Sequence, residues 1–245
     1  MTLLDQLLED LVTANRILAS ENIVDAFGHV SVRHPDRPDR FLLSRARPPE
    51  LVEREDIMEF TLQGEPAENP DEKAYLERFI HGAVFEARPD VQCVIHSHSR
   101  NVIPFSITAE RLRPVLHSCA TIGNEVPVWD SQTSFGDTDL LISNMAMARD
   151  FARILDAGTC ALMRGHGSTV AGRSIKEAVY TAIYLDVNAD LQSKAAQFGN
   201  VKFLSSGEIK AINARLSGGK SGEGFSRAWD YWRRRAFEIA PEIGR

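Results

Sequence analysis

The sequence predicts an α/β fold, because helical and strand-like patterns alternate irregularly along a single chain of 245 residues. The composition, with 43% hydrophobic and 25% charged residues, is typical of one large globular domain with a substantial core. The elements do not form a regular βαβ array, and the sequence has no glycine-rich phosphate loop. We expect one domain over residues 1–216, a linker rich in glycine and serine over 217–224, and a basic aromatic tail over 225–245 that lies at a subunit interface.

The first half of the chain is expected to hold two helices and four strands. Leucines at helical spacing, preceded by Thr2 and Asp5 as a capping pair, predict a helix that ends near Asn22. A second helix is predicted to begin at Pro70 and to reach Ala87. Strands are predicted over residues 27–33, 41–44, 57–62 and 91–96.

The second half is expected to begin with an edge strand over 126–129, because Pro127 cannot donate a hydrogen bond to a neighbouring strand. Another strand is predicted over 159–163. The capping box formed by Ser174 and Glu177 predicts the start of a long helix. Helices are expected over residues 140–155, 174–198 and from 205 onward.

The charge and the termini exclude several classes of protein. A formal net charge of −6 without a long basic run argues against nucleic acid as a partner. No apolar run approaches the length of a membrane span, and no basic segment precedes an apolar one at the start of the chain. The three cysteines are widely spaced, which favours buried free thiols in a reducing compartment. We therefore expect a cytoplasmic protein with no membrane partner.

Three histidines predict a metal site. His96 and His98 lie at the end of a predicted buried strand, and residues two apart on a strand point to the same face. His166 lies between two glycines after another predicted strand, and could complete a three-histidine triad. Glu77 is the candidate fourth ligand, although a solvated glutamate paired with a nearby cation remains an alternative. His81, four residues after Glu77, is either its hydrogen-bonding partner or a packed helix residue.

Five separated segments resemble motifs of the class II aldolase/adducin family in order and spacing, over roughly residues 5–215. These segments are 27–33, Glu77 with 79–81, 88–91, 96–98 and 165–167. The resemblance implies a three-layer α/β/α sandwich around a mixed, mainly antiparallel sheet. It also implies a homotetramer with the active site at a subunit boundary. One divalent ion, which could be zinc, manganese, cobalt or iron, would be held by Glu77, His96, His98 and His166.

The sequence departs from the sugar-phosphate aldolases of that family. Gly28-His29 stands where those enzymes usually have Gly-Asn, and Tyr75 and Leu76 stand where they have phosphate-binding hydroxyl residues. The loop over residues 43–49 also lacks the small residues that a phosphate cradle needs. We therefore do not expect a phosphorylated sugar as substrate. The sequence looks more like the branch that contains hydroxy-aromatic and pyridine dicarboxylate decarboxylases.

The resemblance places Gly28, Ser44 and Arg45 in the loops that would bind substrate. The guanidinium groups of Arg45 and Arg47 suit a carboxylate, although both could instead be surface arginines in a polar loop. The small-molecule substrate would then carry a carboxylate together with a hydroxyl or carbonyl group.

Glu77 and His29 are the candidate catalytic residues. His29 could exchange a proton with substrate, or it could only donate a hydrogen bond to a substrate carboxylate. In the tail, Tyr231 or Trp229 could cover the site of a neighbouring subunit or could pack at an interface.

These expectations favour a metal-dependent lyase that decarboxylates a hydroxylated aromatic or heteroaromatic acid. One alternative is an aldolase that cleaves an unphosphorylated or aromatic hydroxy-carbonyl compound. Another is a non-catalytic interaction module of the adducin type, which would have lost its metal ligands.

Overall fold

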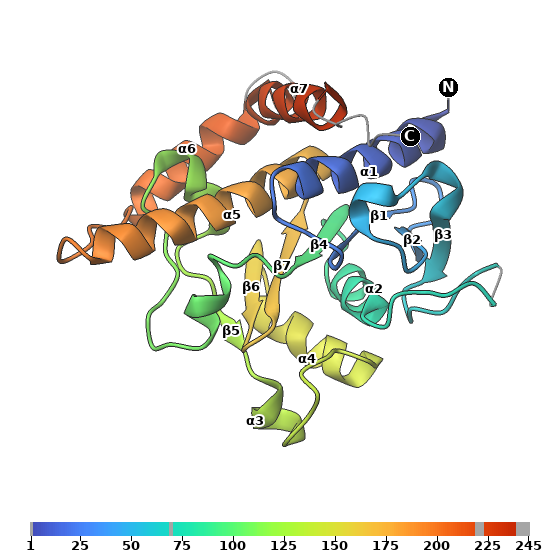
Figure 1. Cartoon of the computed structure of the whole chain (residues 1–245), viewed down its shortest axis with the longest axis horizontal. Coiled ribbons are helices and arrows are strands. Elements are labelled where there is room, and N and C mark those ends of the chain that lie inside the picture. Colours follow the sequence, from blue (N-terminus) through green and yellow to red (C-terminus); the bar gives the residue numbers. More distant parts are fainter. Residues whose placement is uncertain (1, 69–70, 219–222, 239–245) are drawn as a thin grey trace, which may run out of the picture.

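The computed structural model describes residues 2–68, 71–218 and 223–238 and is built on one seven-stranded sheet (Figure 1). The order of the strands across the sheet is β3-β2-β1-β4-β7-β6-β5. The strands are β1 (His29–Arg33), β2 (Arg40–Ser44), β3 (Ile57–Thr61), β4 (Cys93–Ser97), β5 (Val128–Trp129), β6 (Cys160–Met163) and β7 (Gly167–Gly172).

Every neighbouring pair of strands in this order is antiparallel except β5 and β6, which are parallel. Strand β5, which Pro127 directly precedes, lies at the edge of the sheet as predicted. At the centre, His29 on β1 is the direct partner of His96 on β4. The mixed, mainly antiparallel sheet that the family resemblance implied is thus confirmed.

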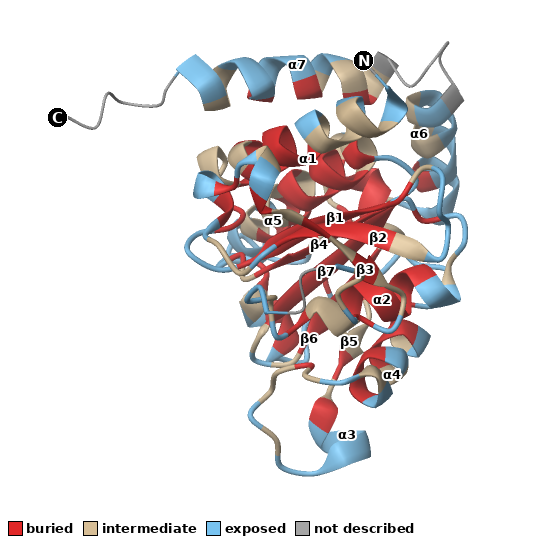
Figure 2. Ribbon diagram, turned by 90° about the vertical axis from the view of Figure 1, so that its right-hand side faces the viewer, coloured by how far each residue is buried: buried red, intermediate tan, exposed pale blue. Residues whose placement is uncertain are grey.

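Helices cover both faces of this sheet (Figure 2). Helices α1 and α5 lie on one face, and α2 and α4 lie on the other. The α-helices are α1 (Leu3–Ser20), α2 (Arg78–Ala87), α3 (Ser131–Phe135), α4 (Met145–Leu155), α5 (Ile175–Ala196), α6 (Ser206–Gly218) and α7 (Glu223–Glu238). Short 3₁₀ helices span Pro49–Leu51, Arg54–Asp56, Ile103–Ser106 and His117–Ile122. The predicted three-layer α/β/α sandwich is confirmed.

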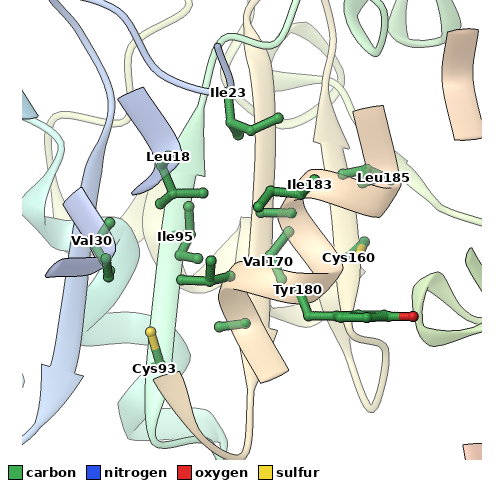
Figure 3. Close-up of a cluster of buried hydrophobic side chains, with 14 of the residues drawn as sticks. Leu18, Ile23, Val30, Cys93, Ile95, Cys160, Val170, Tyr180, Ile183 and Leu185 are labelled. Atoms are coloured by element: carbon green, nitrogen blue, oxygen red, sulfur yellow. The ribbon is translucent and has the colours of Figure 1, made fainter. Parts of the chain in front are cut away.

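The sheet separates two hydrophobic cores. Alternation along β1 sends Val30 and Val32 into the core beneath α1 and α5, while Ser31 faces the opposite side. Figure 3 shows part of this first core, in which Ile95 and Val170 of neighbouring strands meet side chains from the two helices. The second core lies between the sheet and the pair α2 and α4.

The C-terminal helix α7 packs across α1 and α5 of its own chain. Phe225, Trp229 and Trp232 are buried in the first core, where the ring of Tyr180 contacts Phe225 and Trp232. Tyr231 is exposed on the same helix. Residues 217 and 218 of the predicted linker belong to α6 and residues 223 and 224 to α7, and its remainder lies outside the described residues.

The expectations about the elements are wrong at two helix starts and one strand. The helix expected over residues 140–155 begins only at Met145, after its N-cap Asn144. The helix predicted from Pro70 begins at Arg78, so Glu77 is its N-cap residue rather than a residue inside the helix. Strand β7 was not predicted, because Gly167–Gly172 consists of small residues without a clear alternation of apolar and polar side chains. Among the described residues, no helix is long and apolar enough to cross a membrane.

Candidate metal centre

The side chains of His96 and His98 converge at the end of the central strand β4. Pairing with β1 on one side and β7 on the other fixes the backbone of His96. The two Nε2 atoms of His96 and His98 lie 2.9 Å apart, and Nε2 of His166 lies 3.0 Å from Nε2 of His98. Nitrogen lone pairs repel one another at these distances, so a proton or a cation must lie between them.

His166 reaches this point from the turn between β6 and β7. Gly165 in this turn has a φ of +65°, a conformation that glycine adopts without strain. The Nδ1 atom of His166 donates to the carbonyl oxygen of Leu140 over 2.9 Å, which leaves the Nε2 lone pair free for the cluster. A Cβ atom on Gly167 would lie only 2.3 Å from the carbonyl oxygen of Ser97, so glycine is required for the close approach of the two strands.

Glu77, the N-cap residue of α2, completes the cluster. Its Oε1 atom accepts a hydrogen bond of 3.1 Å from the backbone N–H of Ile142. Its Oε2 atom lies 3.5 Å from Nε2 of His96 and 3.4 Å from Nε2 of His166. One ligand atom from each of the four residues lies within 4.8 Å of the others. The structure therefore brings together the predicted ligand set.

The charges in the cluster suit a divalent cation. Burial alone would raise the pKa of Glu77, but the facing His96 and His166 outweigh it and hold that pKa well below its usual range. Burial, with His96 next to it, lowers the pKa of His98 to about 4. Burial lowers the pKa of His166, but Glu77 outweighs it and raises that pKa. Zn²⁺, Mn²⁺, Co²⁺ or Fe²⁺ require a carboxylate and neutral imidazoles, so binding of the ion would release any proton that His166 holds. The donor set thus fits the ion that the family resemblance implied.

His29 lies beside this cluster. Its ring centroid is 5.1 Å from that of His96 and 4.6 Å from that of Tyr75. Its Nδ1 atom lies 2.6 Å from Nε2 of His81, and Nδ1 of His81 lies 2.6 Å from the hydroxyl of Ser31. Both ring nitrogens of His81 are therefore taken by His29 and Ser31, which leaves neither for a hydrogen bond with Glu77.

Gly28 sets the path of the chain into His29. Its φ is +99°, and a Cβ atom there would lie 2.6 Å from Cγ1 of Val24 and 3.1 Å from the carbonyl oxygen of His96. We expect Gly28→Ala to lower the free energy of unfolding by about 1–3 kcal/mol and to lower activity by displacing His29. Denaturant titration would measure the first effect.

Gly136→Ala is the matched control, since Gly136 also has a positive φ, of +71°, but has no atom within 4 Å of a new Cβ. Gly136→Ala should lower the free energy of unfolding by less than Gly28→Ala, because it only strains the backbone. Equal losses in the two variants would contradict the role of close packing at Gly28.

Ser44 and Arg45 belong to the second predicted substrate loop. Ser44 is buried, and its hydroxyl donates to the phenol oxygen of Tyr75 over 3.4 Å. Arg45 and Arg47 both bind Asp56, with nitrogen–oxygen distances of 2.6 and 2.7 Å. The two guanidinium groups thus grip a carboxylate, but it belongs to the same chain.

This arginine pair should stabilise the fold in a pH-dependent way. Burial works to raise the pKa of Asp56, but the N–H of Glu53 and the guanidiniums of Arg45 and Arg47 outweigh it and lower that pKa. A carboxyl with a lowered pKa stabilises the fold above its unfolded value of about 3.9, and this stability is lost as pH falls through the folded pKa.

We expect Asp56→Asn to lower the free energy of unfolding by about 2 kcal/mol at pH 7, and by less near pH 3. Urea titrations at both pH values would measure the difference. Asp39→Asn, at an exposed carboxylate 3.8 Å from Arg40, should change stability by less than about 0.5 kcal/mol. A loss for Asp56→Asn that is independent of pH would contradict the assignment.

Two residues near the cluster, Arg100 and Phe27, were not predicted from the sequence as part of the site. Arg100 and His98 line the same hollow, of about 390 Å³, and the hollow also contains Asp25 and Asp186. Phe27 is 66% exposed, with its ring centroid 6.4 Å from that of His98. The position of Arg100, two residues after His98, could have indicated that it lies near the site. The sequence does not show whether the ring of Phe27 is exposed or buried.

Comparison with known proteins gives matches over most of the chain. A family model described as "Class II Aldolase and Adducin N-terminal domain" matches residues 9–193. Decarboxylase tropJ of Talaromyces stipitatus is 34% identical over 245 residues, which cover 90% of each protein. A 3,4-dihydroxyphthalate decarboxylase of Arthrobacter keyseri is 29% identical, over 78% of this chain and 79% of that protein.

Solved structures show the same fold. The L-fuculose 1-phosphate aldolase from Glaciozyma antarctica PI12 aligns with a TM-score of 0.76 at 23% sequence identity. The alignment covers 99% of this chain and 93% of that one.

Proposed function

Because this chain belongs to the class II aldolase and adducin family, we propose that it is a metal-dependent carbon–carbon lyase that decarboxylates a hydroxylated aromatic or heteroaromatic acid. The resemblance read from the sequence is confirmed by the family match and by the decarboxylases among the relatives. Both these decarboxylases and the fuculose-phosphate aldolases of the same fold are lyases. The observation that carries the proposal is the convergence of the donor atoms of Glu77, His96, His98 and His166.

These four side chains would hold one divalent ion, and selection among zinc, manganese, cobalt and iron depends on geometry and supply. When bound, the ion supplies positive charge that stabilises the negative charge developing on an oxygen next to the breaking bond. In the proposed substrate, that oxygen is a ring hydroxyl ortho to the departing carboxylate.

Glu77 is the leading candidate for proton exchange. The N–H of Ile142 holds one carboxylate oxygen, and the other oxygen faces His96 and His166. A carboxylate in this position can take the proton of a ring hydroxyl and return a proton to the ring carbon that loses CO₂. His29 is the second candidate, because it lies beside His96 and is buried.

The surroundings of the cluster favour an aromatic acid over a sugar phosphate. Exposed Phe27, with its ring 6.4 Å from that of His98, offers a face for a flat substrate ring. Tyr75 lies against His29, and its phenol oxygen is engaged by Ser44 and by the backbone N–H of Arg47. The bulky phenol therefore fills a position where a phosphate cradle needs small residues.

The decisive experiment is to measure CO₂ release from a panel of ortho-hydroxy aromatic acids, with 3,4-dihydroxyphthalate as the first member. We expect turnover by protein saturated with Zn²⁺ or Mn²⁺, loss of turnover after dialysis against a chelator, and recovery when the metal is returned. No turnover across the panel would overturn the proposed reaction.

The same assay should include retro-aldol substrates. Cleavage of an unphosphorylated hydroxy-ketone, without CO₂ release from the acids, would favour the aldolase alternative. The adducin-like alternative rests on loss of the metal ligands, and here all four candidate ligands are present and converge. Protein that binds no divalent metal at neutral pH would revive it.

We also propose a homotetramer. Ile107, Leu191 and Phe198 are exposed apolar residues, and Phe198 is 93% exposed. Light scattering after size-exclusion chromatography should give about four times the chain mass of 27.3 kDa. Phe198→Asp should shift the protein to smaller species, and Tyr231→Asp would test the contribution of the tail. A monomeric wild type would contradict the proposal.

A further inference from the structure

Three buried polar side chains form a hydrogen-bonded chain that ends beside the candidate metal centre. Ser31 and His29 lie two residues apart on β1 and face the same side of the sheet. His81 of α2 lies against both of them, with Nδ1 2.6 Å from the Ser31 hydroxyl and Nε2 2.6 Å from Nδ1 of His29. Ser31 and His81 are each 0% exposed, so bulk water does not compete for either contact.

The serine sets the direction of the hydrogen bonds. His81 is the one hydrogen-bonding partner of the Ser31 hydroxyl among the described residues. A buried hydroxyl with one partner donates its proton to that partner, because otherwise the O–H remains unsatisfied. Nδ1 of His81 must then be the acceptor. A neutral imidazole carries one N–H, so Nε2 of His81 carries the proton and donates it to Nδ1 of His29.

This direction determines which ring nitrogen of His29 carries the proton. With Nδ1 occupied as an acceptor, neutral His29 must carry its own proton on Nε2. No hydrogen-bond partner within the described chain occupies this second nitrogen, and the ring lies next to His96. A neutral histidine in this tautomer can donate a hydrogen bond there but cannot accept a proton there.

We propose that Ser31 and His81 are positioning residues that fix His29 as a hydrogen-bond donor through Nε2 to a negatively charged substrate oxygen, a carboxylate or a ring oxygen. The inference rests on the proposed function for the identity of that oxygen. It leaves Glu77 as the residue that exchanges protons. His29 then contributes to the binding and orientation of the acid.

The tautomer can be measured without turnover. In ¹⁵N-histidine-labelled protein saturated with Zn²⁺, long-range ¹H–¹⁵N correlations distinguish a proton on Nδ1 from one on Nε2. The signal of His29 is assigned by its loss in His29→Asn. We expect His29 to be neutral with its proton on Nε2 in the wild type. A proton on Nδ1, or a doubly protonated ring, would overturn the inference even if CO₂ release is observed.

Two serine variants test whether Ser31 sets the direction of these hydrogen bonds. In Ser31→Ala, His81 can reverse, so His29 should populate both tautomers. Ser31→Thr keeps the hydroxyl and should keep the wild-type tautomer. Ser168→Ala is the matched control, because this buried hydroxyl lies in the same sheet and, among the described residues, forms its side-chain hydrogen bond with the Ser97 hydroxyl. An unchanged tautomer in Ser31→Ala would overturn the role of the serine.

Kinetics on the best acid of the panel separate a donor from a proton-exchanging residue. A donor to a charged oxygen acts in the ground state too, so Ser31→Ala should raise KM about tenfold and change kcat by less than about threefold. His81→Leu should raise KM further, whereas His81→Gln, which retains an acceptor and a donor, should recover part of the loss. Bound zinc should stay at the wild-type level in all variants. A fall in kcat at constant KM would contradict the donor role.

Discussion

Replacing His98 with alanine is expected to abolish metal binding and turnover while leaving the fold intact. Its Nε2 atom lies within 3.0 Å of Nε2 of both His96 and His166, so its loss removes the ligand shared by both close contacts. Even residues that only support metal ligands change affinity by about 10–100-fold, and a lost ligand should exceed that range. Zinc content after dialysis and the rate of CO₂ release would measure the two effects.

The fold should survive because His98 follows β4 and is not part of either hydrophobic core. Circular dichroism should therefore show a wild-type spectrum for the metal-free variant. His117→Ala, at an exposed histidine away from the cluster, is the control and should retain full zinc content. Stoichiometric zinc in His98→Ala would exclude the proposed ligand set.

Glu77→Gln should separate metal binding from proton exchange. The glutamine keeps the length of the side chain and a carbonyl oxygen that can accept from the N–H of Ile142. Its amide cannot take or return a proton, so kcat should fall by about 10²–10⁴-fold. Metal affinity should fall less than in His98→Ala, because the three histidines remain. Steady-state kinetics at saturating metal, together with calorimetric metal titration, would show the separation.

Glu86→Gln is the matched control for this substitution. Glu86 belongs to α2, the helix that follows Glu77, but its carboxylate pairs with Arg149 on the outer surface. Its loss should leave kcat unchanged. If Glu77→Gln turned over substrate at the wild-type rate, Glu77 would have no part in the reaction.

Much of the fold could be predicted from the sequence, because its strongest patterns are local. Helix α1 and its capping box follow from Thr2, Asp5 and the spacing of the leucines. The alternation along β1 correctly separated Val30 and Val32 from His29 and Ser31. Strand β7 has no such pattern, since its small residues suit the close approach of β4 rather than a hydrophobic face.

The candidate site was predictable only in part. Pairing between β1, β4 and β7 brings the histidines together, and their positions at strand ends pointed to this convergence. The partner of Arg45 could not be predicted from the sequence, because a guanidinium binds a substrate carboxylate and the carboxylate of Asp56 equally well. The contact of His81 with Ser31 depends on where α2 begins, and the proline signal at residue 70 placed that start too early.

The short stretch of residues 140–142, which precedes α4, limits where the length of the chain can change near this centre. The carbonyl of Leu140 orients His166, and the N–H of Ile142 orients Glu77, although these two side chains are 89 positions apart in the chain (166 − 77). Leu140 itself adopts a φ of +67°, which aligns this short stretch. Insertions within it would misalign both ligands together, whereas the exposed bend at residues 136–137, after α3, can change length without such a penalty.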